Sequence, residues 1–414
     1  MAFSVRGNTE VPLPQFNLFE LNPVKSSIES SNLVEYLPVT SLTDADNMSP
    51  LEFSVLSPAD YLDMSYVKLY GKIKIVNADG TDIVIPPGKP VEAEYGLSNN
   101  LSGSLFKQAD VMLQNKLISG GVPLLPYFSM FRRLMYTDAD QLDSLKASAL
   151  FVKDAPRAMN GVANNSNNYG MTSRMAYNWS HTFEFFDFIQ CDMLLSCNRY
   201  LLNGVPLRIK LFPNDPKFVL SSTDPENKQF KIKFLEAKLL VRHIRPINGI
   251  ILGHNEALKM SSAIYPFIHH SIRSYAIPPG LTQISIDQIA TILPDSVVVG
   301  MVTSDAFNGD WGLNPYNFQN FGLREMFLCI NGVSAPSYPL QCEFPSHFAE
   351  AGNPLSSSTR FVEAYTRLFE KSGANCPRTS KSNITPSEFI NGYSLYNFEL
   401  LSFCEGSDSK LYKE

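Results

Sequence analysis

Cysteine and charge are both scarce in this sequence, and each scarcity excludes a class of protein. The 414 residues include only six cysteines, and none of them belongs to a Cys-x-x-Cys pair. So sparse a set cannot form a disulfide framework, and it favours a reducing compartment. Charged residues make up 18% of the chain, and 34 Lys and Arg stand against 40 Asp and Glu, which gives a net charge of −6. This balance argues against a strongly basic nucleic-acid binder.

Long hydrophobic runs are absent as well. Residues 1–16 contain no apolar segment of the kind that forms a signal peptide. The longest apolar stretches, at residues 250–252 and 297–302, are far too short to span a bilayer. We therefore expect neither a signal peptide nor insertion into a membrane.

The common catalytic and phosphate-binding motifs are also missing. The sequence has no G-x-x-x-x-G-K-S/T, G-x-S-x-G or H-E-x-x-H motif, and His254 is not followed by the P-C-x-x-C that a zinc deaminase needs. A calcium loop that begins at Asn77 would place Gly88 where its terminal Glu must stand. We therefore assign no catalytic, cofactor-binding or metal-binding residue, and we expect no cofactor.

We interpret the isolated histidines, cysteines and carboxylate pairs as structural residues rather than as parts of a functional site. His269 and His270 lie in a strand-like run, where neighbouring side chains point to opposite faces, so we do not expect them to share a metal ion. Cys191 and Cys197 stand among apolar neighbours, which is typical of buried, inert thiols. Carboxylate pairs near turns more often form caps or Asx turns than acid–base pairs. Three such pairs are Asp79 with Asp82, Asp138 with Asp140, and Asp305 with Asp310.

Apolar and aromatic residues are plentiful, and their mixture favours many short strands. Hydrophobic residues make up 44% of the chain, with 28 Phe, 18 Tyr and 28 Pro. This composition supports a large core and disfavours long helices. Asn-Gly dipeptides supply the positive φ angles of tight hairpin turns. Six of them begin at Asn160, Asn203, Asn248, Asn308, Asn331 and Asn391.

The clearest strand covers residues 66–76. Its odd-numbered positions from Val67 to Ile75 are mostly aliphatic, and lysines alternate with them, so one face is buried and the other faces water. A return strand is predicted at residues 83–85, after the turn at residues 77–80. Further strands are predicted at residues 110–113, 182–188, 205–212, 230–243, 263–272, 297–302, 324–330 and 393–401.

Helical periodicity is limited to two segments, residues 127–136 and 361–369. A domain boundary is predicted at residues 245–249, where a long strand pattern stops at Arg245-Pro246. We therefore predict an extended arm at residues 1–30, a first β domain at residues 31–245 and a second at residues 246–414.

Several segments resemble one family of proteins, in the same order along the chain. They are SIE at residues 27–29, VEYLP at 34–38, YLLNGVPLRIKL at 200–211, DAFNGDWGLNPYNFQNFGL at 305–323 and NGYSLY at 391–396. Together they resemble the major capsid protein of Polinton (Maverick) elements and adintovirus-like viruses, from about residue 18 to about residue 402. The residues that carry this resemblance are Asn203, Gly204, Phe307, Asn308, Gly309, Trp311, Asn314, Pro315, Tyr316, Phe318, Phe321, Asn391, Gly392 and Tyr393.

The resemblance implies an all-β fold with a few inserted helices: a tandem double jelly roll of two antiparallel β-sandwiches, with residues 31–245 as the first roll and 246–414 as the second. It implies a structural role in which homotrimers form the pseudo-hexagonal capsomers of an icosahedral shell around double-stranded DNA. The implied partners are further copies of the chain and penton or minor capsid proteins, with DNA contacted only indirectly. The implied location is the virion capsid, made inside the host cell and not secreted.

One departure from the family concerns the end of the chain. Family members continue after the Asn-Gly-Tyr strand with a further alternating strand region, whereas residues 405–410 here are polar and the sequence stops at Glu414. It is therefore open whether the second roll has its last strand, and the chain fits a host-genome-integrated copy.

Within the resemblance, residues 306–322 are interpreted as a structural loop. Asn-Gly and Asn-Pro would form turns, and five aromatic side chains, Phe307, Trp311, Tyr316, Phe318 and Phe321, would fill space. Two alternatives remain beside the capsid interpretation. One is a lectin-like jelly-roll binding module, and the other is a sandwich-fold enzyme acting on glycans with Asp305 and Asp310 as its acid pair.

Overall fold

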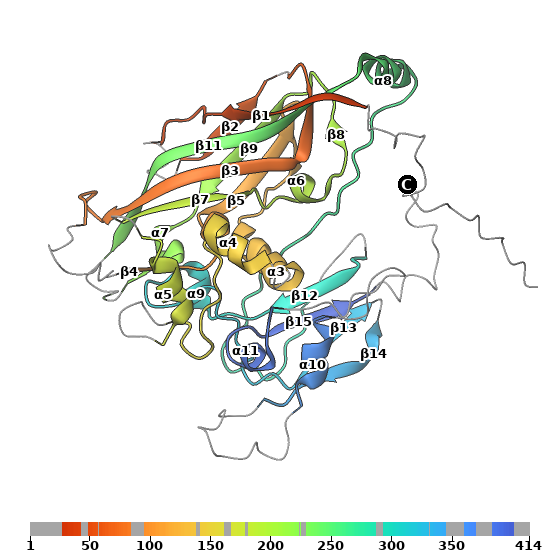
Figure 1. Cartoon of the computed structure of the whole chain (residues 1–414). Helices are drawn as coiled ribbons and strands as arrows, with labels where there is room; N and C mark the ends of the chain where they lie inside the picture. The colour runs from red at the N-terminus through yellow and green to blue at the C-terminus, as the bar shows by residue number, and fades with distance from the viewer. Residues whose placement is uncertain are drawn as a thin grey trace, which may run out of the picture.

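Antiparallel strands dominate the chain, and the helices between them are short (Figure 1). The computed structural model describes residues 27–42, 49–56, 58–83, 95–137, 141–160, 167–178, 181–222, 224, 229–286, 293–330, 332–344, 360–369 and 383–400. Most of the predicted N-terminal arm, the end of the chain from residue 401, and Asp138 with Asp140 lie outside these residues.

The first sheet is built around two long strands that pair along most of their length. Its order is β1-β11-β3-β7, and β8 pairs with the other end of β3. These strands span β1 Ile28–Tyr36, β3 Tyr61–Asn77, β7 Thr182–Phe188, β8 Tyr200–Leu201 and β11 Phe230–Pro246. Every pairing in this sheet is antiparallel.

A second sheet lies against the first, and its order is β2-β9-β5-β6. Its strands are β2 Leu51–Val55, β5 Phe106–Leu113, β6 Lys116–Ser119 and β9 Leu207–Pro213. A short antiparallel ladder of β4 Tyr95–Leu97 and β10 Leu220–Ser222 adjoins them. Two facing sheets with alternating side chains make this part of the chain a β-sandwich.

The first core consists of the buried side chains that β2, β3, β5, β7, β9 and β11 direct between these sheets. On β3, Val67, Leu69 and Ile73 are buried, while the lysines between them are partly exposed. The predicted alternation of this strand is therefore confirmed. Gly71 stands opposite the ring of Phe185, and a Cβ there would lie 2.3 Å from that ring, so only glycine fits.

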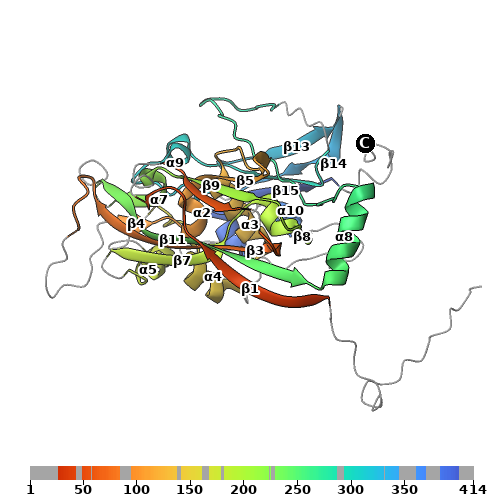
Figure 2. The same cartoon turned by 90° about the horizontal axis from the view of Figure 1, so that it is seen from above.

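Ten helices are found among the described residues, and most of them connect strands. They are α2 Leu101–Ser104, α3 Leu125–Tyr136, α4 Leu142–Ala149, α5 Tyr169–Met175, α6 Asp192–Ser196, α7 Pro216–Val219, α8 Asn248–Met260, α9 Ser304–Asn308, α10 Val362–Arg367 and α11 Pro386–Ile390. The predicted helices at 127–136 and 361–369 correspond to α3 and α10. Helix α8 lies at one end of the sandwich in both views (Figures 1 and 2).

The second core lies below the first in Figure 1, with α3 and α4 between them. Its described ladders are short: β12 Ser296–Gly300 pairs with β15 Leu395–Glu399, and β13 Glu325–Ile330 pairs with β14 Val333–Gln341. Aromatic side chains from loops and from α3, α10 and α11 fill the space around them. Tyr127 and Met130 of α3 belong to this core although they precede it in the sequence.

The fold confirms the predicted class, an all-β chain of antiparallel sheets with a few inserted helices. Of the eight further strands predicted after residues 83–85, seven correspond to β5, β7, β9, β11, β12, β13 and β15. The strand predicted at residues 263–272 is wrong, because this segment is extended but forms no ladder. Of the predicted return strand, only Ile83 is described, next to a single bridge between Asp82 and Val76.

Candidate functional site

The loop at residues 305–323 connects the two cores. Its Trp311 ring packs against the first core and makes an edge contact with Phe230, with the ring centroids 6.3 Å apart. The carbonyl of Trp311 accepts a hydrogen bond of 2.7 Å from the backbone of Ser222, at the end of β10. Five residues later, Tyr316 is fully buried in the second core, and Phe318 follows it there. One short loop therefore anchors in both cores.

The start of this loop contacts helices α3 and α7. Phe307, on α9, stacks on Tyr127 with the ring centroids 5.4 Å apart. Asn308 is exposed, and Gly309 after it has a φ of 89°, in the region that favours glycine. A Cβ at Gly309 would lie 3.0 Å from the side chain of Lys217, so α9 approaches α7 closely.

A buried cluster of polar groups, which we term the inter-core joint, lies where this loop meets the rest of the chain. It consists of Asp154, Asn168, Arg174, Asn314 and Tyr393, all of them buried. Arg174 donates to Asp154 over 2.6 Å and also to the carbonyl of Leu97 on β4 over 3.0 Å. Asn314 donates to the other carboxylate oxygen of Asp154 over 2.9 Å.

Each member of the joint has its hydrogen-bonding groups engaged. Asn168 donates to Asp154 over 3.0 Å and caps α5 by accepting from the backbone of Met171. Tyr393 donates its hydroxyl proton to the carbonyl of Asp154 over 3.1 Å. Burial raises the pKa of the Tyr393 phenol well above its usual value, so this hydroxyl remains a donor. A buried ion pair of this kind is tolerated only where further hydrogen bonds compensate for lost water.

Residues 391–396, another segment that carries the resemblance, pair with the loop at residues 305–323 beside the joint. Phe318 donates its backbone N–H to Gly392 over 2.9 Å, and Ser394 donates to Phe318 over 3.0 Å. Gly392 has a φ of 120°, and a Cβ there would lie 2.0 Å from the sulfur of Met159. Only glycine permits this approach. Asn391 is half-buried and accepts a hydrogen bond from Arg157.

A second ion pair joins the segment that contains Asp154 to helix α11. Lys153, next to Asp154, lies 2.7 Å from Glu388 on α11 and also donates to the carbonyl of Asn383. Glu388 completes a capping box with Thr385, since each side chain bonds the backbone N–H of the other. Sequence reasoning missed Lys153, Asp154, Arg174 and Glu388. Only Glu388 had a readable signal, the T-x-x-E spacing after which α11 begins.

The remaining residues of the resemblance lie elsewhere. Asn203 and Gly204 form an exposed turn between β8 and β9, where Gly204 has a φ of 76° and bonds the carbonyl of Pro58. Pro315 is buried beside Asn314. Phe321 differs from the expectation that it fills space, because 54% of it is exposed and its φ is 46°. It follows the buried part of the loop and points to the surface.

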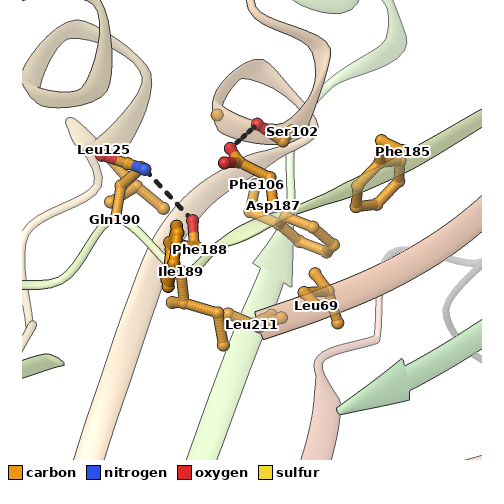
Figure 3. Close-up of a pocket in the computed structure, with 11 residues that line it drawn as sticks. Leu69, Ser102, Phe106, Leu125, Phe185, Asp187, Phe188, Ile189, Gln190 and Leu211 are labelled. Atoms are coloured by element: carbon orange, nitrogen blue, oxygen red, sulfur yellow. Dashed lines mark hydrogen bonds between the residues drawn. The ribbon is translucent and has the colours of Figure 1, made fainter. Parts of the chain in front are cut away.

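A third buried ion pair borders a small cavity. Arg133 of α3 pairs with Asp187 of β7, which also accepts a 2.5 Å hydrogen bond from Ser102 (Figure 3). The cavity beside them has a volume of about 20 Å³ and is lined mainly by apolar side chains, among them Leu69, Phe106 and Leu211. Pockets that hold drug-sized molecules are typically a few hundred Å³ or more, so this one has room for little more than a water molecule.

The alternative enzyme site receives no geometric support from its acid pair. Asp305 is exposed in the first turn of α9. The carboxylate of Asp310 accepts from the backbone of Gly312 over 2.7 Å, which is an Asx turn. Within the described part of the chain, no group of three or more His, Cys, Asp or Glu is arranged to hold a metal ion.

The cysteine and histidine interpretations have different outcomes. Cys191, Cys197 and Cys342 are buried free thiols, and burial raises the pKa of Cys191 and of Cys342 to about 11. Cys191 and Cys342 are therefore poor nucleophiles. The reason given for His269 and His270 is wrong, because they do not lie in a paired strand: both Nδ1 atoms reach the carboxylate of Asp192.

Comparison with known proteins gives one relative by sequence and several solved structures. An uncharacterized protein of Caenorhabditis elegans, F54H12.2, is 24% identical over 349 residues, which is 82% of this chain and 77% of the relative. No family model matches the sequence. No helix in the described part of the chain is long and apolar enough to cross a membrane.

The solved structures are viral. A chain of the Sputnik virophage structure aligns with 58% of this chain at a TM-score of 0.38 and 13% identity, and the Faustovirus major capsid protein aligns with 58% at 0.35 and 9%. The mavirus major capsid protein aligns with 70% at 0.35 and 12%. The aligned part spans little more than half the length of each of these chains, at 53%, 57% and 53%. These scores are low, and the fold described above is established by the strand ladders themselves.

Proposed function

We propose that this chain is a viral-type major capsid protein, a structural protein rather than an enzyme. The observation that carries the proposal is the meeting of two sequence segments that resemble the Polinton and adintovirus capsid protein. Residues 305–323 and 391–396 are far apart in the sequence, yet Phe318 pairs with Gly392 in the second core, and the loop that carries Phe318 also anchors Trp311 on the first core. A tandem β-sandwich protein needs such a connection to hold its two cores in one orientation.

The proposed working state is a homotrimer that tiles an icosahedral shell around double-stranded DNA. Permanent assemblies of this kind often bury more than about 2,000 Å² of largely apolar surface. The described surface offers apolar side chains for such contacts, including Leu252, Met260 and Ile264 beside the first sandwich and Val333 and Tyr338 beside the second core. Penton and minor capsid proteins are the further proposed partners, and the proposed location is the capsid of a virion made inside the host cell. The net charge of −6 favours indirect contact with DNA.

Sedimentation and negative-stain electron microscopy of the purified full chain test this proposal. We expect a species of three times the 46.2 kDa chain mass at micromolar concentration, and three-fold tiles or closed shells in the images. A chain that stays monomeric and forms no particles at any concentration would contradict the proposal and favour a lectin-like binding module. Variants of Leu252 and Val333 to Asp should keep the fold and lose the trimer, because each places a charge on an exposed apolar site.

A further inference from the structure

Residues 261–272, which we term the strap, lie along the outside of the molecule between α8 and the second core. In Figure 1 the chain leaves α8 and runs beside the first sandwich towards β12. The strap is extended but pairs with no strand. Its side chains alternate: Tyr265 and Phe267 pack against the first core, whereas Ile264 and Ile268 are exposed. Farther along, Ile272 packs against the second core, so the strap is in contact with both.

Among the described residues, no strand ladder holds the strap. It is held instead by hydrogen bonds to α6 and to the residues that follow α6. Ser196 accepts the backbone N–H of Ile268 over 2.9 Å, and Arg199 donates to the carbonyl of Ile264 over 2.7 Å. The Tyr265 hydroxyl accepts the N–H of Leu202 over 3.1 Å. Because these bonds use side chains rather than a continuous ladder, the strap can detach without unfolding a sheet.

Asp192 makes the densest set of these contacts. Its carboxylate is buried and accepts three hydrogen bonds from the strap. The donors are the backbone N–H of His270 at 2.8 Å, Nδ1 of His270 at 2.7 Å and Nδ1 of His269 at 3.1 Å. Both imidazoles retain access to water, since 73% of the His269 side chain and 43% of the His270 side chain are exposed. Protons from solution can therefore reach them.

Two further ionisable groups lie near Asp192. Arg132 on α3 interacts electrostatically with Asp192, and Cys191 precedes it on the same chain. Arg133, the next residue on α3, is paired with Asp187 of β7. The ring of Phe128 lies 5.1 Å from that of His270 and adds no charge. Asp192 is thus the one anion that the two imidazoles contact among the described residues.

From this geometry we infer that Asp192, His269 and His270 form a pH-sensitive latch that holds the strap. An imidazole ordinarily takes up a proton near pH 6.5, whereas a carboxyl group does so near pH 4. In a pair of this kind, acidification in general turns the imidazole into a cation before it neutralises the carboxylate. Protonation of either imidazole then adds the attraction of a full positive charge to the hydrogen bond that the carboxylate of Asp192 already accepts, and this strengthens the contact. Acidification from about pH 8 to about pH 5.5 therefore tightens the strap against α6.

Hydrogen exchange measured by mass spectrometry on the full chain tests the latch. Exchange is followed in peptides covering residues 261–272 near pH 8 and near pH 5.5, with rates corrected for the intrinsic effect of pH on exchange. We expect the protection of the strap to rise about threefold at the lower pH, which is the size expected for a partly exposed ion pair. Amides of β3 away from the latch serve as the internal reference for changes in the whole fold.

Three variants separate the latch from other causes. The double variant His269→Gln and His270→Gln keeps the backbone bond of residue 270 to Asp192 but cannot titrate, so the effect of pH on the strap should disappear. Asp192→Asn should loosen the strap at both pH values. His254→Gln is the matched control, because His254 bonds Tyr61 outside the latch, and it should keep the wild-type response.

Two outcomes would overturn the inference. One is a wild-type strap whose corrected exchange is the same at both pH values, and the other is a double histidine variant that responds to pH like the wild type. If Asp192→Asn fails to fold, the histidine variants still decide the question. The measurement is made below the concentration at which trimers form, so its result is independent of the proposed capsid role.

Discussion

The first and second cores are stabilised in different ways. The first is a sandwich of long strands, in which β3 and β11 pair over most of 17 residues each and aliphatic side chains alternate inwards. The second has two described ladders of short strands, and rings such as Tyr127, Phe318 and Phe389 occupy most of its interior. In the first core, regular ladders pair the backbone N–H and C=O groups. In the second core, the backbone groups of the loops need individual hydrogen bonds to side chains or to other loops.

This difference explains why buried charge gathers at the border of the second core. The loops that meet there bring carbonyl and amide groups into the interior without a ladder to pair them. Asp154, Arg174 and Asn314 pair these groups, and Lys153 with Glu388 does so on the other side. The comparison predicts that removing a charge at this border destabilises the protein more than removing a surface ion pair of the first sandwich.

The largest expected effect follows from Asp154→Asn. The substitution leaves the guanidinium of Arg174, which is fully buried, without its counter-charge. Breaking a buried pair in this way typically costs about 3 to 5 kcal/mol of unfolding free energy. Urea unfolding followed by circular dichroism measures the change.

The matched control for the joint is Arg245→Gln on the first sandwich. Arg245 lies 3.0 Å from Asp60, but 55% of its side chain is exposed, so its loss should destabilise the protein far less than Asp154→Asn does. Equal losses for the two variants would show that the joint does not have the special role in stability that the comparison assigns to it.

The next effect concerns two aromatic residues of the same loop. Phe318→Ala removes a buried ring that contacts Phe131 and Tyr127, and it should lower the unfolding free energy by about 3 to 4 kcal/mol. Phe321→Ala removes a ring that is mostly exposed, and it should change stability by less than about 0.5 kcal/mol. Thermal unfolding of both variants separates them, and an unchanged melting temperature for Phe318→Ala would contradict the packing role of the loop.

The same contrast decides what could be predicted from the sequence. Residues 182–188 were predicted as a strand with the bounds of β7, where the buried Phe183 and Phe185 alternate with more exposed side chains. β1 was missed because it is an edge strand, mostly exposed, and it carries no alternation. Residues 263–272 do alternate, but their backbone bonds go to side chains of α6, and local periodicity cannot tell a strap from a strand.

Only part of the inter-core joint could be predicted from the sequence, for a related reason. Asn314 and Tyr393 belong to segments that the resemblance singled out, so they were named. Asp154 and Arg174 have no local pattern, and only the tertiary fold brings them within 2.6 Å of each other and next to Asn314. Local sequence patterns do not reveal which residues far apart in the sequence come into contact, so this part of a site cannot be predicted from a single sequence.

A smaller effect is expected at the start of α11, where Thr385 caps the helix. Thr385→Ala removes the hydrogen bond that the Thr385 hydroxyl oxygen accepts from the backbone N–H of Glu388, and it should cost about 1 kcal/mol. Thr303→Ala is the matched control, since Thr303 occupies the same position before α9 but makes no side-chain capping bond. Urea unfolding should show a clear loss for the first variant and almost none for the second. Similar losses would mean that the intrinsic preference for Thr, not the capping box, determines the effect.

The smallest effect is a dependence of stability on pH that originates in the first sandwich. Burial lowers the pKa of His181, which bonds Tyr95 over 2.8 Å, and it also lowers the pKa of His243, which bonds Tyr36 over 2.9 Å. A histidine with a lowered pKa binds a proton more readily when unfolded, so its contribution is present above about pH 6.5 and is lost as the pH falls through the folded pKa.

The midpoint of urea unfolding should therefore be lower near pH 5.5 than near pH 7.5, and this decrease should be smaller in His181→Gln. His254→Gln, which alters a histidine on α8 outside the first core, should leave the decrease intact. Global stability and strap protection are then expected to respond to acid in opposite directions, since burial lowers the pKa of His181 and of His243. A midpoint that rises on acidification, or one that falls equally in all three proteins, would assign the pH dependence to groups other than His181.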